Sequence, residues 1–143
     1  MNERTLLCAV WLMVMVGSSG AASAQSAPAP TLDFETFRTS VQPIFLHKRE
    51  KLARCYVCHS QGTPLRLQLL SPGATTWDEE QSRKNFEAVR RLVVPGNPAA
   101  SRLLQMPLAA DAGGVAFHPG GKHWTSQSDP EWQVLANWVR GAK

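Results

Sequence analysis

The sequence predicts an all-α domain, and three observations support this fold class. Apolar residues recur at helical spacing in several segments, residues suited to helix capping precede them, and no alternation of strands and helices is present. The length of 143 residues suits one domain, and the 43% hydrophobic and 18% charged content excludes a disordered or fibrous chain. Fifteen Lys and Arg against eleven Asp and Glu give a net charge of +4 without long basic runs, which disfavours nucleic-acid binding.

The first 24 residues predict a secretory signal peptide. A polar start, an apolar run over 5–16 and an A-x-A sequence ending at Ala24 are its three regions, with cleavage expected after Ala24. An uncleaved membrane anchor is the alternative, but the run is short for a span of about 20 residues. Cleavage would remove Cys8 and leave two cysteines, so we expect an exported, periplasmic protein, membrane-tethered if the signal stays attached.

Two segments follow the signal peptide. Residues 25–32 are rich in Ala, Pro and Ser and predict a flexible lead, whereas residues 33–143 form the predicted domain. Asp33 is suited to cap the first helix, and Pro43 predicts that this helix ends, kinks or restarts there. The apolar face of the helix is Phe34, Phe37, Val41, Ile44 and Phe45.

The middle of the domain predicts two further helices. Residues 65–69 alternate like a short strand, although an extended loop over a flat apolar ligand has the same pattern. Thr76 and Glu79 fit a capping box that opens a helix over about 77–93, with Phe86, Val89 and Val93 on one face. The helix stops at 95–98, and Ser101 is expected to cap a short helix after it.

The last helix is predicted most clearly by its two ends. A Gly-rich loop over about 107–126 precedes Asp129, and Pro130 then occupies the first helical position. Gly141 is suited to stop the helix. Its apolar face is Trp132, Leu135, Ala136 and Val139, which we expect to pack near the face of the first helix because neither helix can bury its own.

The segment Cys55-Tyr56-Val57-Cys58-His59 carries the strongest chemical signal. In an exported protein a Cys pair can form a disulfide or a redox motif, but the latter usually precedes a helix in a βαβ unit. A structural zinc site usually needs four ligands, and there is no second Cys pair. Covalent haem c attachment explains the adjacent His as well: each thiol forms a thioether with one vinyl group, and His59 becomes the proximal iron ligand.

With this motif, the mature chain resembles small c-type cytochromes, most closely the planctomycete-type cytochrome c domain. The resemblance implies a cytochrome c-like fold in which the N- and C-terminal helices cross beside one covalently bound haem. It covers nearly the whole mature chain and is carried by Phe37, 41–45, 55–59, 65–67, 94–98, 101–103, 132–135, 138–139 and 141–142.

The second axial ligand of the iron has two main candidates. Met106, followed by Pro, resembles the Met-Pro of many c-type cytochromes, although Met is also a common core filler. His118 lies closer to the last helix, and His118-Pro119-Gly120-Gly121 resembles the family's Met-Pro-Gly-Gly arrangement with His in place of Met. We therefore prefer His118 as distal ligand and keep Met106 as the alternative. His123 is a weaker rival, and His47 is expected at a solvated helix end.

These residues predict a monohaem electron carrier rather than an enzyme, since no general base or nucleophile accompanies the haem motif. The alternative is a haem-based ligand binder or sensor, or a small peroxidase, with a labile sixth position; a structural subunit of a larger redox complex is a third option. The stretch Lys48–Arg54 could steer an acidic redox partner, or could be only a solvated helix end. Four tryptophans are expected to pack around the porphyrin: Trp77, Trp124, Trp132 and Trp138.

Overall fold

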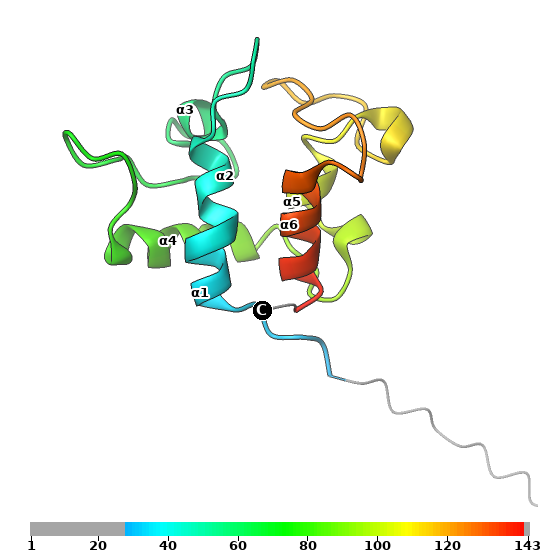
Figure 1. Ribbon diagram of the computed structural model, residues 1–143, viewed down its shortest axis with the longest axis horizontal. Coiled ribbons are helices and arrows are strands. Elements are labelled where there is room, and N and C mark those ends of the chain that lie inside the picture. Colours follow the sequence, from blue (N-terminus) through cyan, green and yellow to red (C-terminus); the bar gives the residue numbers. More distant parts are fainter. Residues whose placement is uncertain (1–27, 142–143) are drawn as a thin grey trace, which may run out of the picture.

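The computed structural model describes residues 28–141, which form an all-α domain (Figure 1). The predicted signal peptide, with Cys8, lies outside the described residues. Within them no strand is present, and an isolated bridge joins Leu108 to Trp124. The α-helices are α1 (Phe34–Thr36), α2 (Gln42–Leu46), α3 (Cys55–His59), α4 (Glu79–Arg90), α5 (Arg102–Gln105) and α6 (Pro130–Val139), with a π-helical turn η1 (Phe37–Val41) and the 3₁₀ turns η2 (Pro98–Ala100) and η3 (Ala110–Ala112).

The N-terminal helical segment begins where the sequence predicts. Asp33 caps it, because its carboxylate accepts a hydrogen bond from the Thr36 amide at 2.7 Å. The segment continues from α1 through η1 into α2, and the π-helical turn lies immediately before Pro43, which has no N–H to donate. Pro43 therefore does not end the helix, which continues to Leu46.

The first and last helices pack together, as their two apolar faces predict. The rings of Phe37 and Trp138 lie 5.6 Å apart between centroids, and both side chains are buried. The Trp138 indole Nε1 also donates a hydrogen bond to the Asp33 carbonyl at 2.9 Å. In α6 the whole predicted face is buried, Asp129 caps the helix, and Gly141 follows its end with a φ of 85°.

The start of α4 differs from the prediction. Its capping box is formed by Asp78 and Gln81 rather than by Thr76 and Glu79, and the helix runs over Glu79–Arg90 instead of about 77–93. Asp78 accepts from the Gln81 amide at 2.8 Å, and the Gln81 side chain accepts from the Asp78 amide at 3.1 Å. Two residue pairs have the same spacing, and the hydrogen bonds show that Asp78 and Gln81 form the cap.

Residues 65–69 form an extended loop, so their interpretation as a strand is wrong. The Leu67 amide donates to the His59 carbonyl at 2.8 Å, and the Gln68 amide donates to Asn85 Oδ1 at 2.7 Å. Leu65 and Leu67 are buried while Leu69 is exposed, which explains the alternation without a partner strand. The loop thus connects α3 to α4 through polar contacts.

Ser101 occupies the N-terminal position of α5 but does not cap it with its side chain. Its hydroxyl instead accepts from the Val94 amide at 2.9 Å and donates to the Asn97 carbonyl at 2.8 Å. These bonds close the turn that separates α4 from α5. Ser101 is fully buried, so both of its polar contacts matter for the local fold.

The last residues of the predicted lead pack against the domain. A Cβ atom at Gly141 would lie 2.6 Å from the Cβ of Pro30, and one at Gly96 would lie 3.1 Å from the Pro30 ring. Leu32 contacts the hydrophobic core. Within the described part of the chain, none of the helices has both the length and the apolar character needed to cross a membrane.

Candidate functional site

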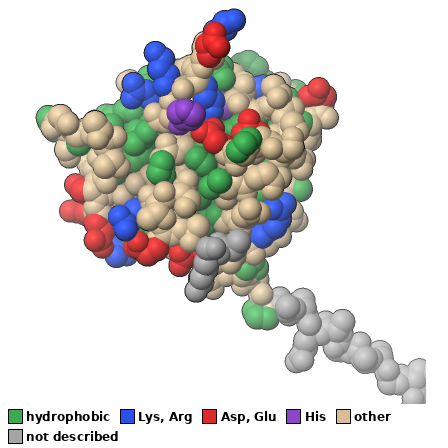
Figure 2. All heavy atoms as spheres, viewed as in Figure 1, with side chains coloured by type: hydrophobic (Ala, Val, Ile, Leu, Met, Phe, Trp, Pro, Cys, Tyr) green, Lys and Arg blue, Asp and Glu red, His purple; other side chains and the backbone are tan. Residues whose placement is uncertain are grey.

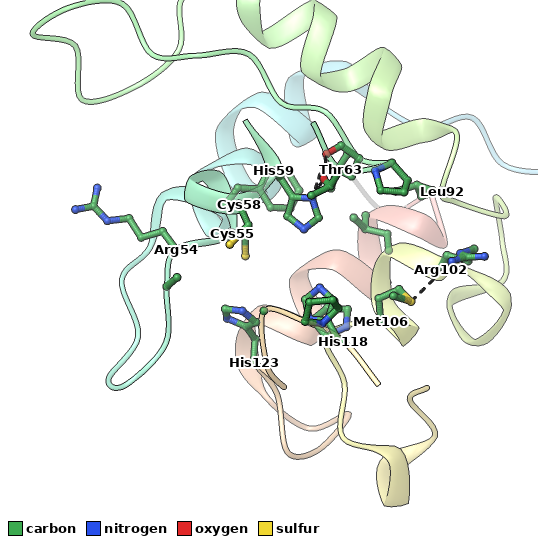
Figure 3. A pocket seen from close by; sticks show the side chains of 18 of the residues that line it. Arg54, Cys55, Cys58, His59, Thr63, Leu92, Arg102, Met106, His118 and His123 are labelled. Carbon is green, nitrogen blue, oxygen red and sulfur yellow. Dashed lines mark hydrogen bonds between the residues drawn. The ribbon is translucent and has the colours of Figure 1, made fainter. Parts of the chain in front are cut away.

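A cavity of about 270 Å³ lies between α3 and the Gly-rich loop, and we call it the histidine cavity. It brings together the six predicted site residues Cys55, Cys58, His59, Met106, His118 and His123 (Figure 3). Its remaining wall is mostly apolar and consists of Phe45, Ala53, Arg54, Thr63, Pro64, Leu65, Leu92, Arg102, Leu103, Pro107, Pro119, Gly120 and Trp124. A largely apolar cleft with a few convergent polar groups is typical of a ligand site.

His59 lies at the end of α3 and is held by its Nδ1 atom. That nitrogen lies 3.1 Å from the Leu65 carbonyl and 2.6 Å from the Thr63 hydroxyl, which itself donates to the same carbonyl. Because a carbonyl can only accept, Nδ1 carries the proton and Nε2 keeps its lone pair. Burial lowers the pKa of His59, which favours this neutral form.

His118 is held in the same way from the opposite wall. Its Nδ1 lies 2.6 Å from the Gly121 carbonyl, so Nδ1 donates and Nε2 again keeps its lone pair. The two glycines make this turn possible. Gly121 has a φ of 82°, and a Cβ at Gly120 would lie 3.2 Å from Cε1 of the His118 ring.

The two imidazoles face each other across the cavity (Figure 3). Their centroids are 6.2 Å apart and their planes differ by only 15°. If both rings bound one metal ion through Nε2 at about 2 Å, the distance from each ring centre to its Nε2 would place the two centroids roughly 6 Å apart. The observed centroid separation of 6.2 Å is therefore compatible with one metal ion between the Nε2 atoms of His59 and His118, because a backbone carbonyl fixes the Nδ1 atom of each ring.

Met106 lines the same cavity but its thioether has another neighbour. The Sδ atom lies 3.9 Å from a guanidinium nitrogen of Arg102, in the direction drawn in Figure 3. The Met106 carbonyl accepts from the Lys122 ammonium at 3.0 Å, and Lys122 also donates to Val115. The Met106 sulfur thus lies beside Arg102, whereas the His118 ring lies nearly parallel to that of His59.

His123 has the opposite ring polarity. Its Nδ1 lies 3.4 Å from an Arg49 guanidinium nitrogen, which can only donate, so Nδ1 accepts and Nε2 carries the proton. Burial, the Arg49 charge and the neighbouring His118 lower the pKa of His123 to about 4. His123 is thus neutral but has no free Nε2 lone pair for a metal in this arrangement.

His47 lies outside the cavity, in a cluster around Glu131 that the sequence did not predict. Nδ1 of His47 lies 2.5 Å from one Glu131 oxygen, and the other oxygen pairs with Arg49 and accepts from Trp124 Nε1 at 3.3 Å. The Arg49 side chain is only 11% exposed. The cluster joins the segment just before Cys55 to the first turn of α6, so Arg49 is not part of a solvated basic rim.

We expect Glu131→Gln to lower the free energy of unfolding by about 1–3 kcal/mol at pH 7. It replaces a charged carboxylate that contacts three donors with a neutral amide that has one acceptor oxygen. Burial alone would raise the pKa of Glu131, but the hydrogen bonds from His47, Arg49 and Trp124 outweigh it and hold the pKa below its ordinary value of 4.5. Stability from this group is therefore present above pH 4.5 and is lost as pH falls through the lowered pKa.

Denaturant titrations at a series of pH values measure this effect. The variant should lose less stability than the parent over the acid range, because its amide does not titrate. Glu87→Gln is the matched control: its partner Arg90 is half exposed, so this substitution should change stability by no more than about 1 kcal/mol. Parallel pH profiles for the parent and Glu131→Gln would contradict the assignment.

Cys55 and Cys58 are both free thiols at one side of the cavity. Cys55 is half-buried, and burial raises its thiol pKa, although Arg49, 4.0 Å from its Sγ, opposes this effect. Cys58 is exposed. Two thiols and an imidazole on one short helix would suit a haem, whose vinyl groups the thiols could bind and whose iron the imidazole could ligate.

Several site residues were missed by the sequence reasoning. Thr63 supports His59, Glu131 and Arg49 anchor the segment before α3, and Lys122 ties two loop carbonyls together. Thr63, Glu131 and Lys122 belong to no local motif, and Arg49 was predicted only as part of the basic stretch Lys48–Arg54, without its partner Glu131. Of the four tryptophans expected around the porphyrin, Trp124 lines the cavity, and Trp77, Trp132 and Trp138 do not. Trp77 packs on Tyr56, and Trp138 packs on Phe37.

Within residues 28–141 no group of three or more His, Cys, Asp or Glu side chains could hold a metal ion. Comparison of the chain with family models, with curated proteins and with solved structures found no match.

Proposed function

We propose that this protein is an exported c-type cytochrome that carries single electrons between redox proteins, with one covalent haem in the histidine cavity. The observation that carries the proposal is the pairing of His59 with His118 beside two free thiols. The nearly parallel rings are 6.2 Å apart, and a carbonyl fixes the outer nitrogen of each. A cytochrome c-like fold is part of the same proposal, supported by the contact between the first and last helices.

The residues present fit the group. Cys55 and Cys58 would hold the haem through thioethers, His59 would be the proximal ligand and His118 the distal one, with Met106 as the alternative. The apolar wall would exclude water from the ring faces. When bound, the haem supplies a one-electron Fe(III)/Fe(II) couple, whose potential is lower with two imidazoles than with an imidazole and a thioether.

A carrier is favoured over a ligand binder or a small peroxidase by the position of His118. Its ring faces His59, and the loop that carries it is fixed by the hydrogen bond to Gly121 and by the two contacts of Lys122. A sensor or peroxidase needs a sixth position that opens to a small molecule. A distal imidazole that is fixed by a hydrogen bond, on a loop with further hydrogen bonds, suits electron transfer without a change of ligand.

The proposed partners are acidic redox proteins, which would approach the side of the cavity near Lys48–Arg54. Lys48, Lys51 and Arg54 are exposed in this stretch, with Glu50 as the opposing charge. Because Arg49 pairs with Glu131, the available charge is smaller than the sequence suggests. Elsewhere, on the face drawn in Figure 2, basic and acidic side chains lie close to one another. Steering by this stretch would speed association at low salt.

Expression of the full chain in cells that assemble haem c tests the function. The parent is expected to retain one haem per polypeptide after denaturation, seen by mass spectrometry and by a pyridine haemochrome assay. Cys55→Ala combined with Cys58→Ala should abolish covalent attachment, because no thioether can form. Ser60→Ala, a half-buried neighbour outside the cavity, is the control and should leave attachment intact. A parent chain without haem in such cells would overturn the proposal.

A further inference from the structure

We propose that Arg102 binds a porphyrin carboxylate at the wall of the histidine cavity opposite the two cysteines, and thereby sets the reduction potential of the bound group. This inference rests on the proposed function. It assigns a role to a residue that belongs neither to the haem motif nor to the axial ligand pair.

The cysteines determine which way the carboxylates point. In a haem the two vinyl groups occupy neighbouring pyrroles, and the two propionates occupy the other two. Thioethers to Cys55 and Cys58 therefore turn the propionate side away from α3. In Figure 3 the cysteines lie on one side of the two imidazoles, whereas Met106 and Arg102 lie on the other.

Arg102 is the cation at that wall. The charged side chains lining the cavity are Arg54 and Arg102, and no Asp or Glu among the described residues lines it. Arg54 directly precedes Cys55 and so belongs to the thioether side. The two other cations nearby are engaged: Arg49 pairs with Glu131, and the Lys122 ammonium donates to two backbone carbonyls.

The charge of Arg102 has no acidic partner in the described part of the chain. Its guanidinium lies 3.9 Å from the Met106 thioether sulfur, which is a weak acceptor. A guanidinium presents a planar fork of donors that matches a carboxylate, so a carboxylate would be a much stronger partner than the thioether.

The backbone around Arg102 is fixed, although its side chain is exposed. The Leu103 amide donates to the Leu92 carbonyl at 3.1 Å, and Leu103 and Leu104 are buried beside it. Arg102 opens α5 and follows the buried Ser101. Carboxylate binding therefore requires a rotamer change of one long side chain and no movement of the main chain.

A guanidinium beside the carboxylate has two electrostatic effects. It favours the less positive, reduced state of the iron, which raises the reduction potential. It also holds the carboxylate in its charged form, which keeps the potential independent of pH over a wider range. Removing the charge should lower the reduction potential and make it depend on pH. A lysine at this position should preserve most of the increase in potential.

The test compares reduction potential against pH for the holoprotein and for Arg102→Gln, Arg102→Lys and Arg54→Gln. For Arg102→Gln we expect one covalent haem and an unchanged low-spin spectrum. We also expect the Fe(III)/Fe(II) equilibrium to favour the oxidised form about tenfold more, a fall of about 59 mV for one electron, and a new pH-dependent step near neutral pH. The reduction potential of Arg102→Lys should lie between those of Arg102→Gln and the parent. Arg54→Gln should change the reduction potential less than Arg102→Gln does.

The outcomes separate the two proposals. A parent without covalent haem would overturn the proposed function. Two results for a haem-loaded Arg102→Gln would overturn the role of Arg102 alone. One is a reduction potential and pH profile equal to those of the parent. The other is a change in reduction potential no larger than the change in Arg54→Gln. If Arg102→Gln does not accumulate, Arg102→Lys carries the test. A reduction potential below that of the parent, by more than the shift in Arg54→Gln and by less than the tenfold shift expected for Arg102→Gln, would support the role of Arg102. A potential and pH profile that coincide with those of the parent would contradict it.

Discussion

Replacing His118 by alanine should convert the oxidised holoprotein from a low-spin to a high-spin spectrum. The variant would lose the proposed second nitrogen ligand of the haem iron, which would then be five-coordinate or water-bound, and the reduced form should bind carbon monoxide readily. The physical basis is the position of the His118 ring, 6.2 Å from the His59 ring and nearly parallel to it, with its Nδ1 fixed by the Gly121 carbonyl. Visible absorption spectra of both oxidation states measure the change.

Met106→Ala is the matched control, because Met106 lines the same cavity from the loop next to α5. Its thioether lies beside Arg102, so its loss should leave the low-spin spectrum nearly unchanged. A sulfur-to-iron charge-transfer band in the oxidised parent, lost in Met106→Ala, would identify Met106 as the ligand instead. A parent that is already high-spin and binds carbon monoxide would favour the ligand-binder function.

Trp138→Ala is expected to destabilise the domain by about 3–5 kcal/mol, the range for removal of a fully buried Trp. The side chain is 1% exposed, packs on Phe37 and Phe86, and donates a hydrogen bond to the Asp33 carbonyl. The substitution therefore opens a void between the first and last helices and removes one of their polar links. Denaturant unfolding followed by circular dichroism gives the change in free energy.

Conservative replacements separate packing from hydrogen bonding. Trp138→Phe keeps much of the ring but loses the bond to Asp33, which should cost at least about 0.5–1.5 kcal/mol. Trp132 is equally buried, but its Nε1 has no hydrogen-bond partner among the described residues. Trp132→Phe should therefore cost less than Trp138→Phe, since it removes an N–H that pays a desolvation penalty. The reverse order would show that ring volume, not the polar link, governs this interface.

Local chemistry explains which parts of the fold were predictable. Asp33 and Asp129 begin their helices as predicted, because a cap and the apolar face after it lie within a few residues. The start of α4 was misplaced because Thr76 with Glu79 and Asp78 with Gln81 have related sequence patterns, and only the observed hydrogen bonds distinguish them. The alternation at 65–69 follows from burial of two leucines under a loop, which local pattern cannot separate from a strand.

The sequence predicts those residues of the candidate site that belong to a local motif. Cys55, Cys58 and His59 are neighbours in sequence, and His118 stands in a recognisable Gly-containing turn. Its position opposite His59 depends on how the Gly-rich loop folds back, which no local rule gives. The same holds for Arg49, which seemed to be a surface charge until the fold brought Glu131 to it, 82 positions along the chain.

The contact between Pro30 and Gly141 places both ends of the described chain together, beside the start of α1 and the end of α6. The histidine cavity borders on the other ends of the same helical segments, where His47 after α2 meets Glu131 in the first turn of α6. A fused partner domain or an immobilising tag could therefore be attached at either end and project from the same pole. In either orientation the face that holds the histidine cavity would stay turned outward, which suits the molecule to directed mounting on a surface.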